Sequence, residues 1–123
     1  MAVTYTTAVK NARLDAVVTA IGSAGVLEIG TTGMGSVLAT IALGNPAGTT
    51  SGGVLTFSGF PRSDTSADAT GTAAAARIRT ASGGTDIITG LTVGTSGSDI
   101  NLDSVSITTG QTVTINSATI THA

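Results

Sequence analysis

Side chains that could do acid–base or metal chemistry are few in this sequence, and they are widely spaced. Its 123 residues hold seven carboxylates, which are Asp15, Glu28, Asp64, Asp68, Asp86, Asp99 and Asp103. A hydrolase that uses paired carboxylates brings two of them together in a cleft, often with aromatic walls that hold a sugar. The chain has only one Tyr, two Phe and no Trp. The scatter of the carboxylates and the shortage of aromatic residues argue against such an enzyme.

One stretch has the spacing that opens a calcium loop, Asp99-Ile-Asn101-Leu-Asp103. An EF-hand loop also needs Gly at its sixth position and a bidentate Glu at its twelfth. Those two positions hold Ser104 and Gly110. The apolar residues between the polar ones favour a strand whose Asn and Asp side chains face solvent, so we expect no metal ion and no other cofactor.

The remaining candidates for catalysis are equally weak. The only imidazole is His122, next to the C-terminal residue, whereas a general base needs a positioned nucleophile and an orienting group. The glycines at 30, 33 and 35 precede no Lys-Ser or Lys-Thr pair, so they fit a hairpin and not a phosphate-binding loop. The absence of Cys excludes disulfides and thiolate metal sites. We therefore expect that the protein is not an enzyme.

Small residues dominate the composition and limit the possible partners. Thr, Ala, Gly and Ser together make up 71 of the 123 residues, and the formal net charge is −2. Five basic residues without a basic run favour no nucleic-acid surface, and no apolar run is long enough to span a membrane. The first residues lack the pattern of a secretory signal, and the lack of Cys fits synthesis in a reducing cytoplasm. A core of small side chains stabilises weakly, so we expect a homo-oligomer, either a dimer or a trimer.

The first 22 residues predict one short α-helix, over about 6–21. Leu14, Val17, Val18 and Ile21 follow the spacing of one helical face, and Tyr5, Val9, Ala12 and Ala16 make a second apolar face opposite. Thr6 or Thr7 could cap its start, and Gly22 suits its end. A helix that is apolar on two sides needs two neighbours, so we assign the face of Leu14, Val17, Val18 and Ile21 to an interface.

After Gly22 the period changes to that of β-strands, separated by turns at regular intervals. We expect a hairpin from 26–29 and 37–43, a turn at Asn45-Pro46, a strand at 54–57, an exposed loop at 62–68, and strands at about 70–80 and 86–93. Shorter strands are expected over 100–107. The last strand, 111–121, changes phase near Asn116-Ser117, which is typical of a β-bulge or of a strand that changes sheets.

Together these elements predict one domain over residues 1–123, with the helix followed by β-structure over about 25–122. Seven or eight strands at this spacing are typical of an antiparallel β-sandwich, jelly-roll-like in its connections. Arg77 and Arg79 alternate on one face of their strand. Two interpretations remain open for them: an interface that meets acidic loops of a partner, or an ordinary solvent-facing pair.

The order of parts resembles a known group of proteins. It comprises a helix ending near Ala20, then Gly25-Val-Leu-Glu-Ile-Gly30 and Val37-Leu-Ala-Thr40, and finally 91–103 running into 109–120. In these phrases the chain is similar to small Gly/Ala/Thr-rich proteins encoded in the structural gene blocks of tailed bacteriophages. The resemblance spans most of the chain but includes no catalytic signature.

The resemblance implies a bacteriophage virion structural protein, of the capsid decoration or cement type. Such a protein would bind the major capsid protein on the capsid exterior after its synthesis in the host cytoplasm. Two alternatives remain: a tail-, neck- or fibre-associated virion component, and a carbohydrate-binding β-sandwich adhesin. The adhesin would need exposed aromatic residues or a calcium cluster, and this sequence offers it only Tyr5, Phe57 and Phe60.

Overall fold

A computed structural model describes residues 5–44, 47–81 and 83–121. The chain begins with α1 (Thr7–Ile21), and the Thr6 side chain caps it by accepting a hydrogen bond from Val9 N at 3.4 Å. Gly22 ends the helix with a φ of 75°, and its N–H donates to Val18 O. Both ends therefore lie where the capping residues predict them.

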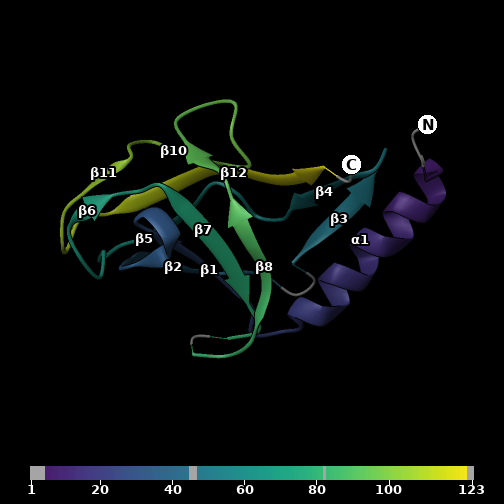
Figure 1. The fold of residues 1–123 in the computed structure, drawn as a ribbon, viewed down its shortest axis with the longest axis horizontal. Helices are drawn as coiled ribbons and strands as arrows, with labels where there is room; N and C mark the ends of the chain where they lie inside the picture. The colour runs from purple at the N-terminus through teal and green to yellow at the C-terminus, as the bar shows by residue number, and fades with distance from the viewer. Residues whose placement is uncertain (1–4, 45–46, 82, 122–123) are drawn as a thin grey trace.

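The first sheet has four antiparallel strands in the order β2-β1-β7-β8 (Figure 1). These strands are β1 (Val26–Gly30), β2 (Val37–Ala42), β7 (Ala75–Arg79) and β8 (Asp86–Leu91). The 3₁₀ turn η1 (Thr32–Met34) joins β1 to β2, which confirms the predicted hairpin. Because β1 lies between β2 and β7, all five of its residues are buried.

The second sheet follows the order β3-β4-β12-β10-β9, with β5 also paired to β12. Its members are β3 (Gly48–Ser51), β4 (Val54–Phe57), β5 (Arg62–Asp64), β9 (Val93–Gly94), β10 (Ile100–Leu102) and β12 (Val113–Thr121). The short pair β9–β10 is parallel, whereas the other pairs in this sheet are antiparallel. A third, two-stranded sheet pairs β6 (Gly71–Thr72) with β11 (Ser106–Ile107).

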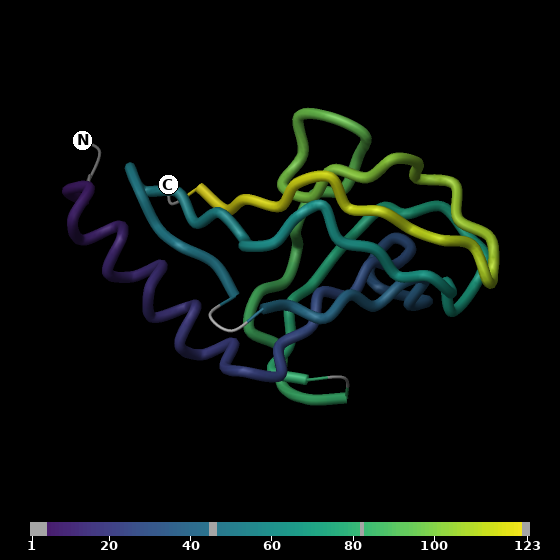
Figure 2. The backbone as a smooth tube through the Cα atoms, turned by 180° about the vertical axis from the view of Figure 1, so that it is seen from behind, coloured from purple at the N-terminus to yellow at the C-terminus, as the bar shows by residue number. Residues whose placement is uncertain are grey.

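One apolar core joins the helix and the two larger sheets. Its fully buried side chains include Ile21 from α1, Leu27 from β1, Ile78 from β7, Leu55 from β4 and Ile115 from β12. The helix lies along one side of the β-structure, beside β3 (Figures 1 and 2). The Asn11 side chain accepts from Gly53 N at 2.9 Å, and Asp15 accepts from Thr50 Oγ1 at 2.8 Å, so polar contacts tie α1 to the β3–β4 hairpin.

The architecture confirms a mainly β chain with one N-terminal helix and antiparallel sheets, and it is consistent with a β-sandwich. The described residues form twelve strand segments instead of seven or eight, because the expected strands at 70–80 and 86–93 are each divided in two, and β3 and β5 form where no strand was expected. The predicted turn at Asn45-Pro46 and the position of His122 lie outside the described residues.

The predicted phase change in the last strand is confirmed. Ser117 pairs with Asn101, but the next paired residue is Ile115, so Asn116 is the extra residue of a bulge. Val113 and Ile115 before the bulge and Ala118 after it are all buried. The bulge thus restores the inward direction of the apolar side chains after a one-residue slip.

The expectation of an exposed loop at 62–68 is wrong for its first half, whereas residues 65, 66 and 68 lie outside any strand and are exposed. Residues 62–64 form β5 against β12, and Ala67 is buried. The segment also covers the free edge of β2: Thr40 N donates to Asp64 Oδ2 at 3.0 Å, and Asp68 N donates to Leu38 O at 2.7 Å. The polar sequence suggested a solvated loop, whereas these carboxylates and amides satisfy an edge strand.

Candidate functional site

The residues with calcium-loop spacing bind their own neighbours. Asp99 Oδ2 accepts from Thr92 N at 3.0 Å, and the Asn101 side chain accepts from Ser98 N and donates to Ser98 O and to Ser117 Oγ. Asp103 is exposed at the end of β10. These contacts hold the loop between β9 and β10 and the bulge of β12, so the polar atoms of Asp99 and Asn101 serve local structure.

The described residues contain no group of three or more His, Asp or Glu side chains that could hold a metal ion, and they enclose no pocket.

The two phenylalanines that could serve an adhesin are not fully exposed. Phe57 is buried in the core, and Phe60 is half-buried, with the Arg62 guanidinium carbon 5.8 Å from its ring centre. Within the described ranges no helix has both the length and the apolar character needed to cross a membrane.

The helical face that we assigned to an interface is turned toward the chain's own core. Leu14 and Ile21 are buried there, and Val17 and Val18 are partly buried against it. A partner could reach Leu14 and Ile21 only if α1 moved off the β-structure. These four residues therefore pack the helix against the apolar core of its own chain.

The opposite face of α1 is exposed and apolar. Tyr5 is 43% exposed and Val9 is 44% exposed, and they are the large hydrophobic side chains that the described residues leave most open. Ala12 and Ala16 are also exposed. We call these four residues the outer helix face. Val9, Ala12 and Ala16 recur at helical spacings, which places them on one side of α1, and Tyr5 lies just before the cap residue.

Arg13 contacts the Tyr5 ring at one edge of the outer helix face. Its guanidinium carbon lies 4.7 Å from the centre of the Tyr5 ring, within the range of a cation–π contact. Figures 1 and 2 show no other segment of the drawn chain along the outward side of α1. The helix thus presents a straight, preformed apolar surface.

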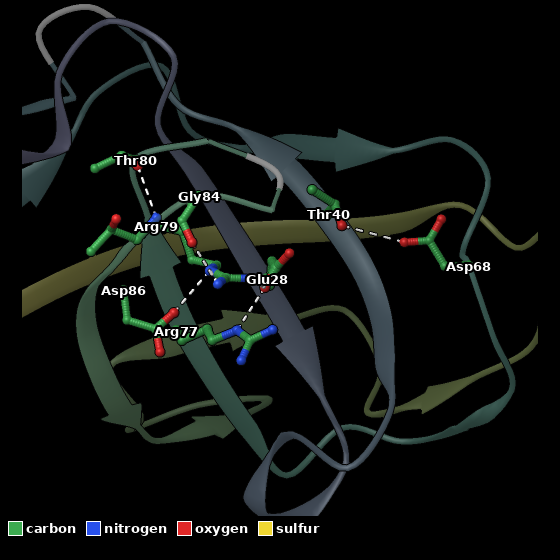
Figure 3. Close-up of polar contacts among 9 residues, drawn as sticks. Glu28, Thr40, Asp68, Arg77, Arg79, Thr80, Gly84 and Asp86 are labelled. Carbon is green, nitrogen blue, oxygen red and sulfur yellow. Dashed lines mark hydrogen bonds and ion pairs between the residues drawn. The ribbon is translucent and has the colours of Figure 1, made fainter.

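A charged network on the first sheet escaped the sequence analysis. Glu28, in the middle of β1, is 5% exposed, and it lies directly opposite Arg77 of β7. Arg77 Nε donates to Glu28 Oε1 at 2.6 Å, and Arg79 Nη1 lies 3.9 Å from the same oxygen (Figure 3). A single buried carboxylate therefore faces two guanidinium groups.

Arg79 completes the network on the far side. Its Nε lies 2.8 Å from Asp86 Oδ1, close enough for an ion pair although the N–H is not aligned for a hydrogen bond. Its Nη2 donates to Gly84 O at 2.6 Å. Asp86 belongs to β8, so the network extends across β1, β7 and β8.

The signal that could have revealed this network was present in the sequence. Glu28 interrupts the apolar run Val26-Leu27-Glu28-Ile29, and a charged residue inside a buried strand requires a partner of opposite charge. The two arginines at alternate positions of one later strand were the only such pair. Their strand had to be placed next to β1 before the partners could be matched.

Comparisons with protein families, curated proteins and solved structures find no match to the chain.

Proposed function

We propose that the protein is a structural component of a tailed-bacteriophage virion, a capsid decoration or cement protein that binds the shell of major capsid protein and stabilises it. The proposal rests on the order of sequence phrases described above, which is similar to that of small virion structural proteins. It places the protein on the capsid exterior, where its function is to bind.

The outer helix face is the structural observation that supports the proposal. Apolar side chains such as Tyr5 and Val9 stay in water at a free-energy cost that docking on another protein would recover. A helix fixed to a β-structure by its inner face keeps its shape, so little conformational entropy is lost on binding. Weak contacts of this kind suffice for a protein that binds many equivalent sites on one shell, particularly as an oligomer.

The test is addition of the purified protein to shells that lack it. We expect saturable binding at micromolar concentration and a rise in the melting temperature of the shell, since a ligand of the folded shell stabilises it. Bound copies per shell are counted by quantitative gel analysis, and the oligomeric state of the free protein by light scattering. Absence of binding at micromolar concentration would overturn the proposal.

The Val9→Asp variant tests the docking surface itself. Val9 is exposed, so the added carboxylate leaves the fold intact but places a charge in the contact, and we expect binding to the shell to be lost. The matched control is Thr95→Asp, which adds the same charge at an exposed position of the loop between β9 and β10. Equal binding by both variants would contradict the role of the outer helix face.

Cross-linking in intact virions distinguishes the shell from other virion locations. We expect Lys10, at the side of α1, to cross-link to major capsid protein. Cross-links to tail, neck or fibre proteins instead would move the protein to those structures.

A further inference from the structure

Among the described residues, the guanidinium group of Arg77 makes a hydrogen bond through only one of its three nitrogens. Its Nε donates to Glu28 Oε1, and the Glu28 side chain is 6% exposed. The two terminal nitrogens, Nη1 and Nη2, have no hydrogen-bond partner among the residues that the structure describes, and the side chain is 22% exposed. Figure 3 shows the terminal nitrogens of Arg77 pointing away from the Nε–Glu28 contact.

This anchoring distinguishes Arg77 from its neighbour. Arg79 directs Nε toward Asp86, Nη2 to Gly84 O and Nη1 toward Glu28, so each of its nitrogens faces an oxygen atom of the chain. Arg77 lies on β7 directly across from Glu28, and β1 is the central partner of β2 and β7. The guanidinium of Arg77 is therefore fixed in orientation while one pair of donors stays open.

We propose that Arg77 is a binding residue whose Nη1 and Nη2 receive a carboxylate side chain of a partner protein. A guanidinium offers five donors in a planar fork, so one edge can stay on Glu28 while the other forms a bidentate pair with a second carboxylate. The anchor reduces the entropy that an arginine otherwise loses on binding. The partner is identified by the proposed function: an acidic segment of the shell.

The charges around Arg77 favour a carboxylate over a polyanion. Glu28 and Asp86 together match the charges of Arg77 and Arg79, so the network leaves Arg77 two open donors but no excess positive charge. Asp86, the other acid of the network, has a side chain that is 43% exposed, and water screens it. The whole chain carries a net charge of −2, with only five basic residues, and this gives no continuous positive surface for a nucleic acid.

The first experiment tests the site without the shell. The Nε–Hε signals of the arginines are followed by NMR while a hexaglutamate peptide is added at low salt, with a hexaglutamine peptide as control. We expect a saturable shift of the Arg77 signal at millimolar hexaglutamate, a much smaller shift for Arg79, and loss of both effects in high salt. Absence of a selective Arg77 shift would overturn the proposal, whatever the shell experiment shows.

The second experiment measures shell binding by Arg77→Lys. Lysine can keep a charge near Glu28 but lacks the second edge, so we expect about tenfold weaker binding, with retained folding checked by circular dichroism. Arg62→Lys is the matched control, because Arg62 donates its Nε and Nη1 to the backbone oxygens of Ser58 and Ala42. We expect this control to bind like the wild type.

The outcomes separate this proposal from the proposed function. If the wild type binds shells and Arg77→Lys binds equally well, the carboxylate contact is overturned and the decoration function stands. If the wild type does not bind shells, the decoration function is overturned, and the hexaglutamate titration alone decides whether Arg77 takes a carboxylate. An Arg77→Lys variant that loses its fold is replaced by Arg77→Gln with Glu28→Gln, which removes the anchor pair together and must bind shells about tenfold more weakly than the wild type.

Discussion

At the scale of single residues, Glu28 is distinctive because its carboxylate is buried in the middle of β1. It is the one charged residue that the described part of the chain buries. Water cannot solvate its carboxylate there, so the stability of that position depends on Arg77 and Arg79. The arginines remain partly exposed, and therefore they lose less hydration than Glu28 does.

Glu28→Gln should destabilise the protein although it keeps the size of the side chain. The neutral amide leaves two guanidinium groups without their shared anion, and we expect a loss of about 2 kcal/mol in the free energy of unfolding. Urea denaturation at neutral pH measures it. Asp86→Asn is the control: its side chain is 43% exposed, so the expected change is about 0.5 kcal/mol or less. Equal losses for both variants would show that burial of Glu28 is not the reason.

At the scale of elements, α1 has two apolar faces with different tasks. The inner face, with Leu14 and Ile21, is buried in the core, whereas the outer helix face with Val9 remains in solvent. The β12 strand has three neighbours: it pairs with β5 near its start, with β10 in its middle, where the bulge at Asn116 lies, and with β4 at its end. Each of these elements connects parts of the molecule that no local contact would join.

Alanine substitutions should separate the two faces of α1. We expect Leu14→Ala to lower the free energy of unfolding by about 3 kcal/mol, because it removes buried methyl groups and leaves a cavity. Val9→Ala removes exposed groups, and the expected change is within about 0.5 kcal/mol. Chemical denaturation of the two variants gives both values. A large loss for Val9→Ala would mean that the outer helix face is covered in the free protein, as in a stable oligomer.

At the scale of the whole molecule, a chain rich in small residues still has a continuous core, made mostly of Leu and Ile side chains. Apolar residues of α1 and both larger sheets pack into one cluster, so the helix and the sheets depend on each other. The surface offers no pocket among the described residues, and its distinctive features are an apolar helix face and an anchored arginine. The proposed binding to a shell depends on these two features.

The shared core predicts cooperative unfolding, which would also support the interpretation of residues 1–123 as one domain. We expect a single calorimetric transition, with an enthalpy of about 85 kcal/mol near 60 °C for a chain of this length. Scanning calorimetry measures this enthalpy directly and compares it with the van 't Hoff value. Two transitions, or a calorimetric enthalpy far above the van 't Hoff value, would show that the helix or one sheet unfolds separately.

The sequence alone determined the local features of this protein, because they depend on neighbours along the chain. Capping residues predict the two ends of the helix, at Thr6 and Gly22. Periodicity and turn chemistry predict the first hairpin and the phase change at Asn116. The segment 62–68 marks the limit of such reasoning. Its polar residues bind the edge of a strand more than twenty positions earlier, which no local pattern indicates.

Only the tertiary structure decided which surfaces are left for a partner. The two faces of α1 are similarly apolar, so periodicity could not show which one the core would take; packing against β3 and β4 buried Leu14 and exposed Val9. Glu28 and Arg77 lie 49 positions apart in the chain, and they meet because β7 pairs with β1 in one register. Strand order and register are set by the balance of the whole core, and therefore the candidate site could be identified only in the folded molecule.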